Sequence, residues 1–318
     1  MGQRPAEPAG IPADRHDSKA IVPPLAPVLP AEVSLRSMKP QAVMDAFDMD
    51  AYFTRIGYTG ERAPVLDTLR AILLRHTETI AFENLNPLMG WPVRLDVESL
   101  QQKMVRDGRG GYCFEHNLLL KHALDALGFR VTGLAARVLW NTPEGSVPAR
   151  SHMLLLVELQ DRRYIVDAGF GGMTLTSPLR LEADIEQTTP HEPFRLVAAG
   201  KEFIEQVKIG GHWVSLYRFS LDEQFLSDYE MANWYLSTYP ASRFVTGLLA
   251  ARPAPDRRYA LLNNQFTIHH RNGGKERRLI TGVAGMRETL ERAFHIALPD
   301  VPALDTVLAR LTEETPSL

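Results

Sequence analysis

The spacing of hydrophobic residues divides the chain into a helical part and a strand-rich part. Between residues 50 and 127, apolar side chains recur at the three- and four-residue spacing of helices that bury one face. This pattern predicts four helices, at 50–56, 64–76, 97–106 and 113–127. Pro64 is expected in the first turn of the second helix, and Gly128 is expected to end the fourth.

From residue 129 the pattern changes to short apolar or alternating runs separated by turn residues, which is typical of β-strands. The predicted strands of this middle region are 129–139, 152–159, 164–167, 194–197, 203–209 and 213–219. A helix follows at 221–236. The remainder predicts strands at 259–268 and 277–281 and helices at 286–294 and 303–311.

These changes predict an α+β chain with three folded domains, which suits a length of 318 residues. A helical bundle occupies 44–128, a barrel or sandwich 129–220 and a small α/β unit 254–318, with a helical connection at 221–253. Residues 1–43 contain many prolines and no aromatic residue. Because such a segment buries too little apolar surface to offset its ordering entropy, we expect a disordered extension there.

The composition argues against several classes of protein, including nucleic-acid-binding and membrane-spanning proteins. The chain is 45% hydrophobic and 23% charged with a net charge of -3, which is ordinary for a globular protein and gives no basic footprint for nucleic acid. No run of 18 apolar residues predicts a membrane span. A single cysteine excludes an internal disulfide and a multi-cysteine zinc site, and it fits a reducing cytoplasm. The histidines show no metal-ligand spacing, so no metal is expected.

That single cysteine is the main candidate for chemistry. Cys113 lies where a glycine-rich turn, Arg-Gly-Gly-Tyr, leads into the helix predicted at 113–127. The positive end of the helix dipole favours the thiolate, which is the nucleophilic form of the side chain. The alternative is a small buried apolar residue, which is the usual role of a lone cysteine.

A cysteine nucleophile needs a base and a group that orients the base. His152 begins one predicted strand, and Asp167 ends the next. If residues 160–161 form a two-residue turn, Leu159 pairs with Arg162, and His152 and Asp167 become diagonal neighbours on one sheet face, about 7–8 Å apart. A three-residue loop would place them on opposite faces. Each residue also has a purely structural interpretation: His152 could be a core histidine, and Asp167 could simply end a strand.

The segment 109–117, Arg-Gly-Gly-Tyr-Cys-Phe-Glu-His-Asn, resembles the active-site signature of the arylamine N-acetyltransferases. Five collinear stretches extend the resemblance over about residues 46–300, at 52–58, 80–85, 151–153, 166–171 and 233–238. Ala81 stands where the family usually has proline.

The resemblance implies a helical bundle, a β-barrel and an α/β lid, with a catalytic core like that of cysteine proteinases and transglutaminases. It implies a Cys113, His152 and Asp167 triad. It also implies a ping-pong reaction in which acetyl-CoA acetylates Cys113 and an arylamine, hydrazine or N-hydroxyarylamine then takes the acetyl group, as in xenobiotic metabolism. Acetyl-CoA is a substrate in this scheme, and no tightly bound cofactor is implied.

The resemblance also suggests binding residues. It places CoA near Gly169, Phe170, Gly171, Asn233 and Trp234. An aromatic acceptor needs an apolar pocket, for which Phe82, Phe114 and Phe170 are candidates, although each could equally belong to the core. The backbone N–H of Cys113 is the expected oxyanion donor.

Three alternatives remain open from the sequence. A related amide synthase would close a macrolactam with the same triad and a carrier-tethered donor. A cysteine protease or transglutaminase-like enzyme shares the triad logic, and a binding module would use Cys113 only structurally. The sequence fits a monomer or a homodimer and does not identify the physiological amine.

Overall fold

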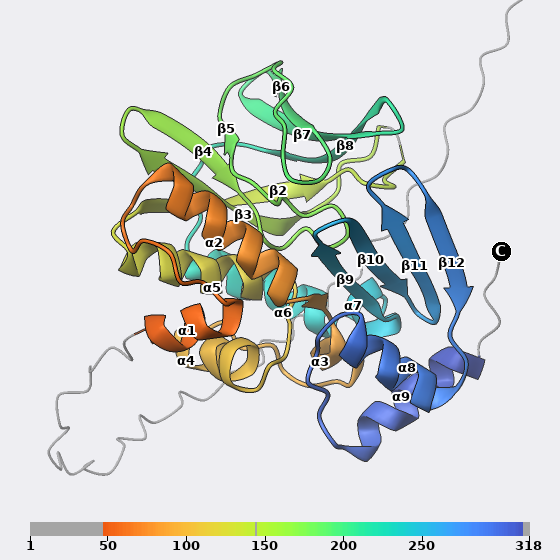
Figure 1. The fold of residues 1–318 in the computed structure, drawn as a ribbon. Coiled ribbons are helices and arrows are strands. Elements are labelled where there is room, and N and C mark those ends of the chain that lie inside the picture. The colour runs from red at the N-terminus through yellow and green to blue at the C-terminus, as the bar shows by residue number, and fades with distance from the viewer. Residues whose placement is uncertain (1–46, 144, 314–318) are drawn as a thin grey trace, which may run out of the picture. The chain divides into compact units, whose positions relative to one another are not determined.

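The computed structural model describes residues 47–143 and 145–313. Contacts divide the chain into two units, Met1–Val43 and Met44–Leu318. The first unit, with the expected extension at 1–43, lies outside the described residues. All that follows concerns the second unit (Figure 1).

Helices dominate the N-terminal part of this unit. In order they are α1 (Met49–Ile56), α2 (Leu66–Thr79), α3 (Leu85–Leu88), α4 (Val97–Leu100), the π-helix η1 (Gln101–Arg106) and α5 (Cys113–Ala126). The helices predicted at 50–56, 97–106 and 113–127 are therefore confirmed, the second as α4 followed by η1. Pro64 was expected inside a helix, but it precedes α2, because Val65 is extended and acts as the N-cap.

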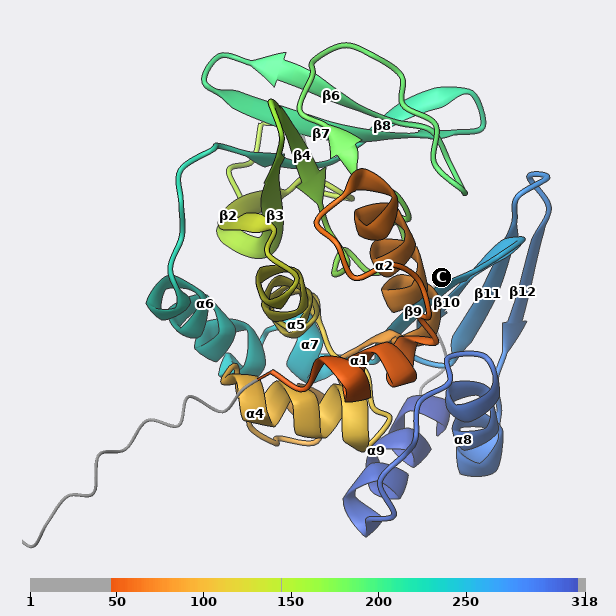
Figure 2. The same ribbon diagram turned by 60° about the vertical axis from the view of Figure 1, so that its left-hand side comes forward.

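The middle part forms one seven-stranded antiparallel sheet in the order β5-β4-β3-β2-β8-β7-β6. Its strands are β2 (Arg130–Val138), β3 (Arg150–Leu159), β4 (Arg162–Val166), β5 (Leu179–Arg180), β6 (Phe194–Ala199), β7 (Glu202–Ile209) and β8 (His212–Phe219). Bridges from Ala183 and Gln187, just after β5, to β6 bring the two edges together. The sheet is thus a nearly closed barrel rather than a sandwich, and α5 packs against β2 and β3 (Figure 2).

The β3–β4 hairpin has the register that the sequence predicted. Leu159 pairs with Arg162 and Leu155 with Val166, so the connection is a two-residue turn. Gln160 adopts φ 54° in that turn. The even loop length keeps His152 and Asp167 on one side of the sheet, as expected.

The C-terminal part contains two helices, a second sheet and two more helices. The helices are α6 (Leu226–Thr238), α7 (Arg243–Thr246), α8 (Gly282–Arg292) and α9 (Pro302–Glu313). The five-stranded sheet has the order β1-β9-β10-β11-β12 and comprises β1 (Phe82–Glu83), β9 (Leu249–Ala254), β10 (Arg257–Leu262), β11 (Gln265–His270) and β12 (Lys275–Leu279). We refer to this sheet with α8 and α9 as the lid.

Two features of the lid differ from the sequence prediction. The single strand expected at 259–268 is the hairpin β10–β11, which turns at Asn263 with φ 51°. The turn takes only two residues, Asn263 and Asn264, so the apolar residues on either side of it read as one strand. The sheet also includes β1, from the helical part of the chain, which pairs with β9.

Two hydrophobic clusters fill the interior. The larger joins the helices to the barrel and contains Cys113 at its edge. The smaller lies in the lid and includes Ala81 and Leu85 beside β1. In the described part of the chain, no helix combines the length and the apolar character needed to cross a bilayer.

Candidate active site

Cys113 is the first residue of α5 and is held there by its neighbours. The Glu115 carboxylate accepts a hydrogen bond from the Tyr112 backbone N–H at 3.0 Å, which caps the helix start. Gly111 donates to the Ala81 carbonyl and accepts from the Glu83 N–H, so the glycine turn lies flat against β1. A Cβ at Gly110 would lie 2.1 Å from the Ala81 oxygen, which explains why glycine is required at this point.

The three residues of the predicted triad converge. His152 Nε2 lies 2.6 Å from Asp167 Oδ2, and both side chains are buried. The Cys113 sulfur lies near enough to His152 to raise the pKa of the ring, and it lies 3.8 Å from the Ser151 carbonyl oxygen. The sequence therefore identified three side chains that meet in one cleft.

A β-bulge aims His152 at the sulfur. Ala136 pairs with His152 while Arg137 pairs with Arg150, so Ser151 is an extra residue in β3. Bulges bend a strand and redirect side chains, and they are common beside active sites. Here the extra residue leaves its carbonyl facing Cys113.

Asn117 is a fourth member of this site that the sequence analysis missed. Its Nδ2 donates to Asp167 Oδ1 at 2.9 Å and to the Met153 carbonyl at 2.7 Å, and its Oδ1 accepts from the Ala168 N–H. It lies one helical turn after Cys113, so that spacing was the available signal. The amide fixes the carboxylate that in turn orients His152.

The charges of the pair are set by burial and by each other. Burial alone would lower the pKa of His152, but Asp167 and the Cys113 sulfur outweigh it and raise the pKa to about 10. Burial would raise the pKa of Asp167, and His152, Asn117 and the Gly169 N–H together lower it below its ordinary value. The histidine is therefore protonated and the aspartate ionised at neutral pH.

A cavity of about 800 Å³ opens in front of Cys113 and His152. One wall is apolar and includes Phe82, Phe170 and Phe244, and the lid contributes residues of β9, β10 and β11. Its cationic or titratable residues include Arg243, Arg258, His269 and Lys275. The cavity thus combines an aromatic surface near the sulfur with positive charge.

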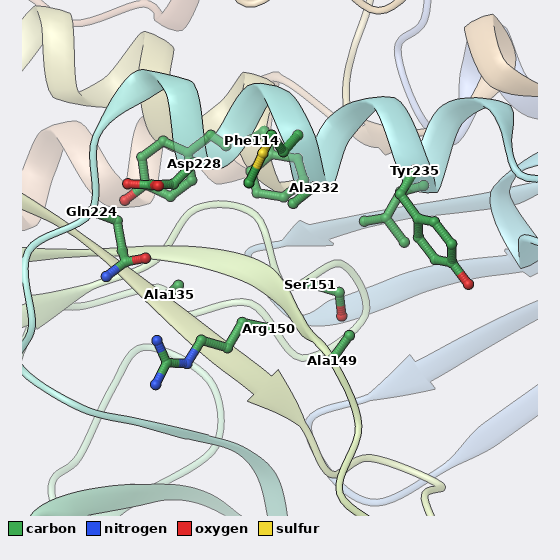
Figure 3. A pocket seen from close by; sticks show the side chains of 12 residues that line it. Phe114, Ala135, Ala149, Arg150, Ser151, Gln224, Asp228, Ala232 and Tyr235 are labelled. Atoms are coloured by element: carbon green, nitrogen blue, oxygen red, sulfur yellow. The ribbon is translucent and has the colours of Figure 1, made fainter. Parts of the chain in front are cut away.

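Two of the three predicted aromatic residues line this cavity. Phe82 and Phe170 do, whereas Phe114 packs against Tyr112 and Tyr229. Successive residues of a helix point about 100° apart, so Phe114 cannot share the direction of Cys113. It lines an adjoining groove of about 350 Å³ beside α6, which shares Ser151, Tyr235 and Leu236 with the cavity (Figure 3).

The five residues predicted near CoA also separate. Gly169, Phe170 and Gly171 line the cavity. Asn233 is buried instead, donating to the Val93 carbonyl and accepting from the Tyr112 hydroxyl. Trp234 is 68% exposed and does not line the cavity. The α6 helix directs its buried face at Tyr112, which draws Asn233 away from the cavity.

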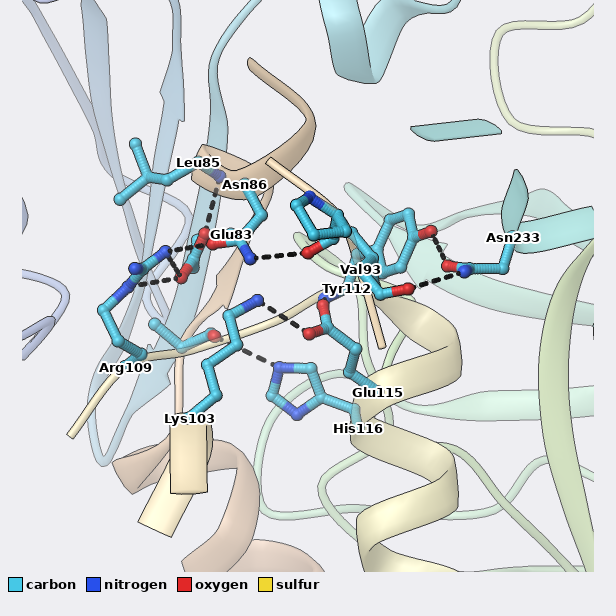
Figure 4. A network of polar contacts seen from close by, with 12 residues as sticks. Glu83, Leu85, Asn86, Val93, Lys103, Arg109, Tyr112, Glu115, His116 and Asn233 are labelled. Carbon is cyan, nitrogen blue, oxygen red and sulfur yellow. Dashed lines mark hydrogen bonds and ion pairs between the residues drawn. The ribbon is translucent and has the colours of Figure 1, made fainter. Parts of the chain in front are cut away.

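A buried polar network supports the glycine turn from behind (Figure 4). Arg109 pairs with Glu83 at 2.7 Å, and Lys103 pairs with Glu115 at 2.7 Å. Burial would raise the pKa of Glu83, but Arg109 and Lys103 lower it to about 2. His116 donates from Nε2 to the Ala81 carbonyl at 3.1 Å. These bonds join β1 to the start of α5.

No group of three or more potential ligands among the described residues is arranged to hold a metal ion. A thiol beside a protonated imidazole, with an ionised carboxylate behind it, is suited to covalent acyl transfer.

Comparison with known proteins gives consistent matches. A family model described as N-acetyltransferase matches residues 65–302. The arylamine N-acetyltransferase of Mycolicibacterium smegmatis is 43% identical over 272 residues, covering 84% of this chain and 98% of the relative. A Salmonella typhimurium protein named arylamine N-acetyltransferase / N-hydroxyarylamine O-acetyltransferase is 40% identical over 254 residues, covering 80% and 90%.

Solved structures agree with the fold. The arylamine N-acetyltransferase of M. tuberculosis matches with a TM-score of 0.80 at 42% identity, covering 82% of this chain and 100% of that one. The Mycobacterium marinum enzyme in complex with CoA matches with a TM-score of 0.80 at 42% identity, covering 84% and 99%. The expected α+β fold class is thereby confirmed.

Proposed function

Because the chain belongs to the arylamine N-acetyltransferase family, we propose that it moves the acetyl group of acetyl-CoA to an arylamine, hydrazine or N-hydroxyarylamine by a ping-pong reaction through Cys113. The observation that carries this proposal is the convergence of Cys113, His152 and Asp167 on one wall of the cavity. Acetyl-CoA serves as the acyl donor.

In the first half-reaction the Cys113 thiolate attacks the thioester carbonyl carbon of acetyl-CoA. The raised pKa of His152 keeps an imidazolium beside the sulfur, and its positive charge stabilises the attacking thiolate. The Cys113 N–H, in the first turn of α5, has no helical carbonyl partner and can stabilise the oxyanion. When the carbon–sulfur bond to CoA breaks, His152 gives its proton to the departing CoA sulfur.

In the second half-reaction the amine nitrogen attacks the acetyl-cysteine carbonyl. His152, now neutral, accepts the proton that the amine loses, and the Cys113 thiolate leaves as the amide forms. Asp167 orients the ring through its 2.6 Å contact and stabilises each imidazolium state. Donor and acceptor use the same histidine in turn.

The cavity contains residues suited to each of the two substrates. Phe82 and Phe170 suit the aromatic ring of an acceptor, while Gly169 and Gly171 allow close approach to the backbone. Arg243 and Lys275 suit the phosphates of CoA. The names of the relatives support the two kinds of substrate, since the M. marinum structure contains CoA and the Salmonella protein is named arylamine N-acetyltransferase / N-hydroxyarylamine O-acetyltransferase. We place this activity in the cytoplasm, acting on xenobiotic amines.

Intact mass spectrometry tests the proposal. Incubation with acetyl-CoA should add one acetyl group, and a subsequent arylamine should remove it. Because Cys113 is the single thiol of the chain, Cys113→Ala should abolish the adduct, while Ser151→Ala, which keeps the neighbouring carbonyl, should retain it. Absence of an adduct would refute the acetyl carrier, and inertness of Cys113 to iodoacetamide would favour a structural cysteine. Acylation only from a carrier-tethered donor would favour the amide synthase.

A further inference from the structure

A second carboxylic acid lies behind the triad, inside the barrel. Glu205 on β7 is 1% exposed, and its Oε2 accepts a hydrogen bond from the Tyr217 hydroxyl at 2.7 Å. Glu205 and Tyr217 are directly paired across β7 and β8. A bulge just beyond them makes Leu216 an extra residue of β8, which lets Tyr217 point inward beside Glu205.

Tyr217 connects this acid to the catalytic histidine. Its ring centroid lies 5.0 Å from that of His152 and 5.2 Å from that of Phe170. The rings of His152 and Phe170 are themselves 5.2 Å apart, so the imidazole sits between two aromatic neighbours. Tyr217 therefore contacts both Glu205 and the ring of His152, so a change in the charge of Glu205 acts on His152 through it.

We propose that Glu205 is a positioning residue of the active site that works in its neutral, protonated form and switches the acetylation step off when it ionises. The neutral acid holds Tyr217 against His152 without adding charge. This inference rests on the proposed acetyl transfer, and it concerns a residue outside the Cys113, His152 and Asp167 triad.

The surroundings favour the neutral acid. Burial and the nearby Asp167 carboxylate raise the pKa of Glu205 to about 8, against the smaller opposing effects of Tyr217 and His152. On the neighbouring strand β6, the residue paired with Glu205 is the apolar Leu196. No lysine or arginine in the described part of the chain is among the groups that shift it. The neighbouring Arg218 instead pairs with Glu202 on the other face of β7.

Ionisation would add a negative charge where the reaction cannot use one. Negative charge develops on the thioester oxygen as Cys113 attacks, and the site already holds the ionised Asp167 carboxylate. A further buried anion opposes that development, because charges interact strongly in a medium of low dielectric constant. The acetylation rate should therefore fall as Glu205 loses its proton.

The pH dependence of Cys113 acetylation gives the kinetic test. In the wild type we expect a fall of roughly three- to tenfold through about pH 8, equivalent to half a unit to one unit of pKa, before the loss of the His152 proton near pH 10. Glu205→Gln should lose the first fall and acetylate faster than wild type at about pH 9. Glu202→Gln, on the same strand but facing outward, should behave as wild type.

Tyr217→Phe separates this role from simple packing. The Tyr217 hydrogen bond lowers the pKa of Glu205, so its removal should move the first fall to higher pH. A packing role would change the rate at every pH equally. If Glu205→Gln falls through about pH 8 as the wild type does, the inference is overturned.

Infrared spectroscopy tests the acid without using the enzyme reaction. The wild type should show the carbonyl band of a buried protonated carboxyl at neutral pH, lost through about pH 8 and missing in Glu205→Gln. Absence of the band in wild type overturns the inference whatever the activity. Presence of the band without acetylation by acetyl-CoA would reject the proposed function and the switching of acetylation, while establishing the neutral acid.

Discussion

Substituting Glu205 by glutamine should stabilise the protein in a manner that depends on pH. The folded protein holds the Glu205 proton up to about pH 8, whereas the unfolded chain releases it near the ordinary value of 4.5. Between these values the unfolded state binds fewer protons, so the free energy of unfolding falls as pH rises. At 1.36 kcal/mol per pKa unit, the full difference is about 5 kcal/mol.

Denaturant unfolding of both proteins at a series of pH values from about 4 to about 9 measures this effect. The free energy of unfolding of Glu205→Gln minus that of the wild type should grow from about pH 4.5 to about pH 8 and then stay constant. Taking this difference cancels the titration of all other groups that behave alike in both proteins. A difference that does not change with pH would refute the raised pKa of Glu205.

Three further substitutions test the site. Gly169→Ala places a Cβ 2.6 Å from Cys113 Cα, so it should cost about 1–3 kcal/mol of stability and most of the acetylation rate. Gly172→Ala is the matched control: its Cβ would have no neighbouring atom within 4 Å, so this variant should unfold as the wild type does. Arg109→Met leaves the Glu83 charge buried and should cost about 3–5 kcal/mol in thermal unfolding, partly recovered by adding Glu83→Gln. Asn117→Ala removes a hydrogen bond that lowers the pKa of Asp167. The fall of the acetylation rate at acidic pH should therefore begin at a higher pH than in the wild type, and a fall at the same pH would contradict this.

The helix start at Cys113 and the pairing of His152 with Asp167 could be predicted from the sequence because each depends on local rules, while the family resemblance joined the three residues. A helix start places Cys113, and the parity of a two-residue turn places His152 and Asp167 on one face. Neither inference needs knowledge of distant contacts. The hairpin register and the helix boundary therefore survive comparison with the structure almost unchanged.

Residues that depend on distant contacts were not found in this way. Glu205 and Tyr217 read as ordinary alternating strand positions, and only the pairing of β8 with β2, which in turn pairs with β3, brings them near His152. Asn233 was expected near CoA because it lies in a family-like segment, and its hydrogen bonds with Val93 and Tyr112 could not be read from that segment. Such orientations follow from packing between elements, which periodicity does not encode.

The pairing of β1 with β9 has a consequence for how the chain folds. Phe82 and Ala251 are neighbours in the lid sheet although more than half of the chain's length separates them. During synthesis from the N-terminus, β1 emerges long before its partner strand, so the wall of the cavity beside Cys113 stays incomplete until the last third of the chain leaves the ribosome. A truncated chain that ends before β9 would carry Cys113, the barrel and β1, yet lack the strand that pairs with β1 and supports the Cys113 turn from behind.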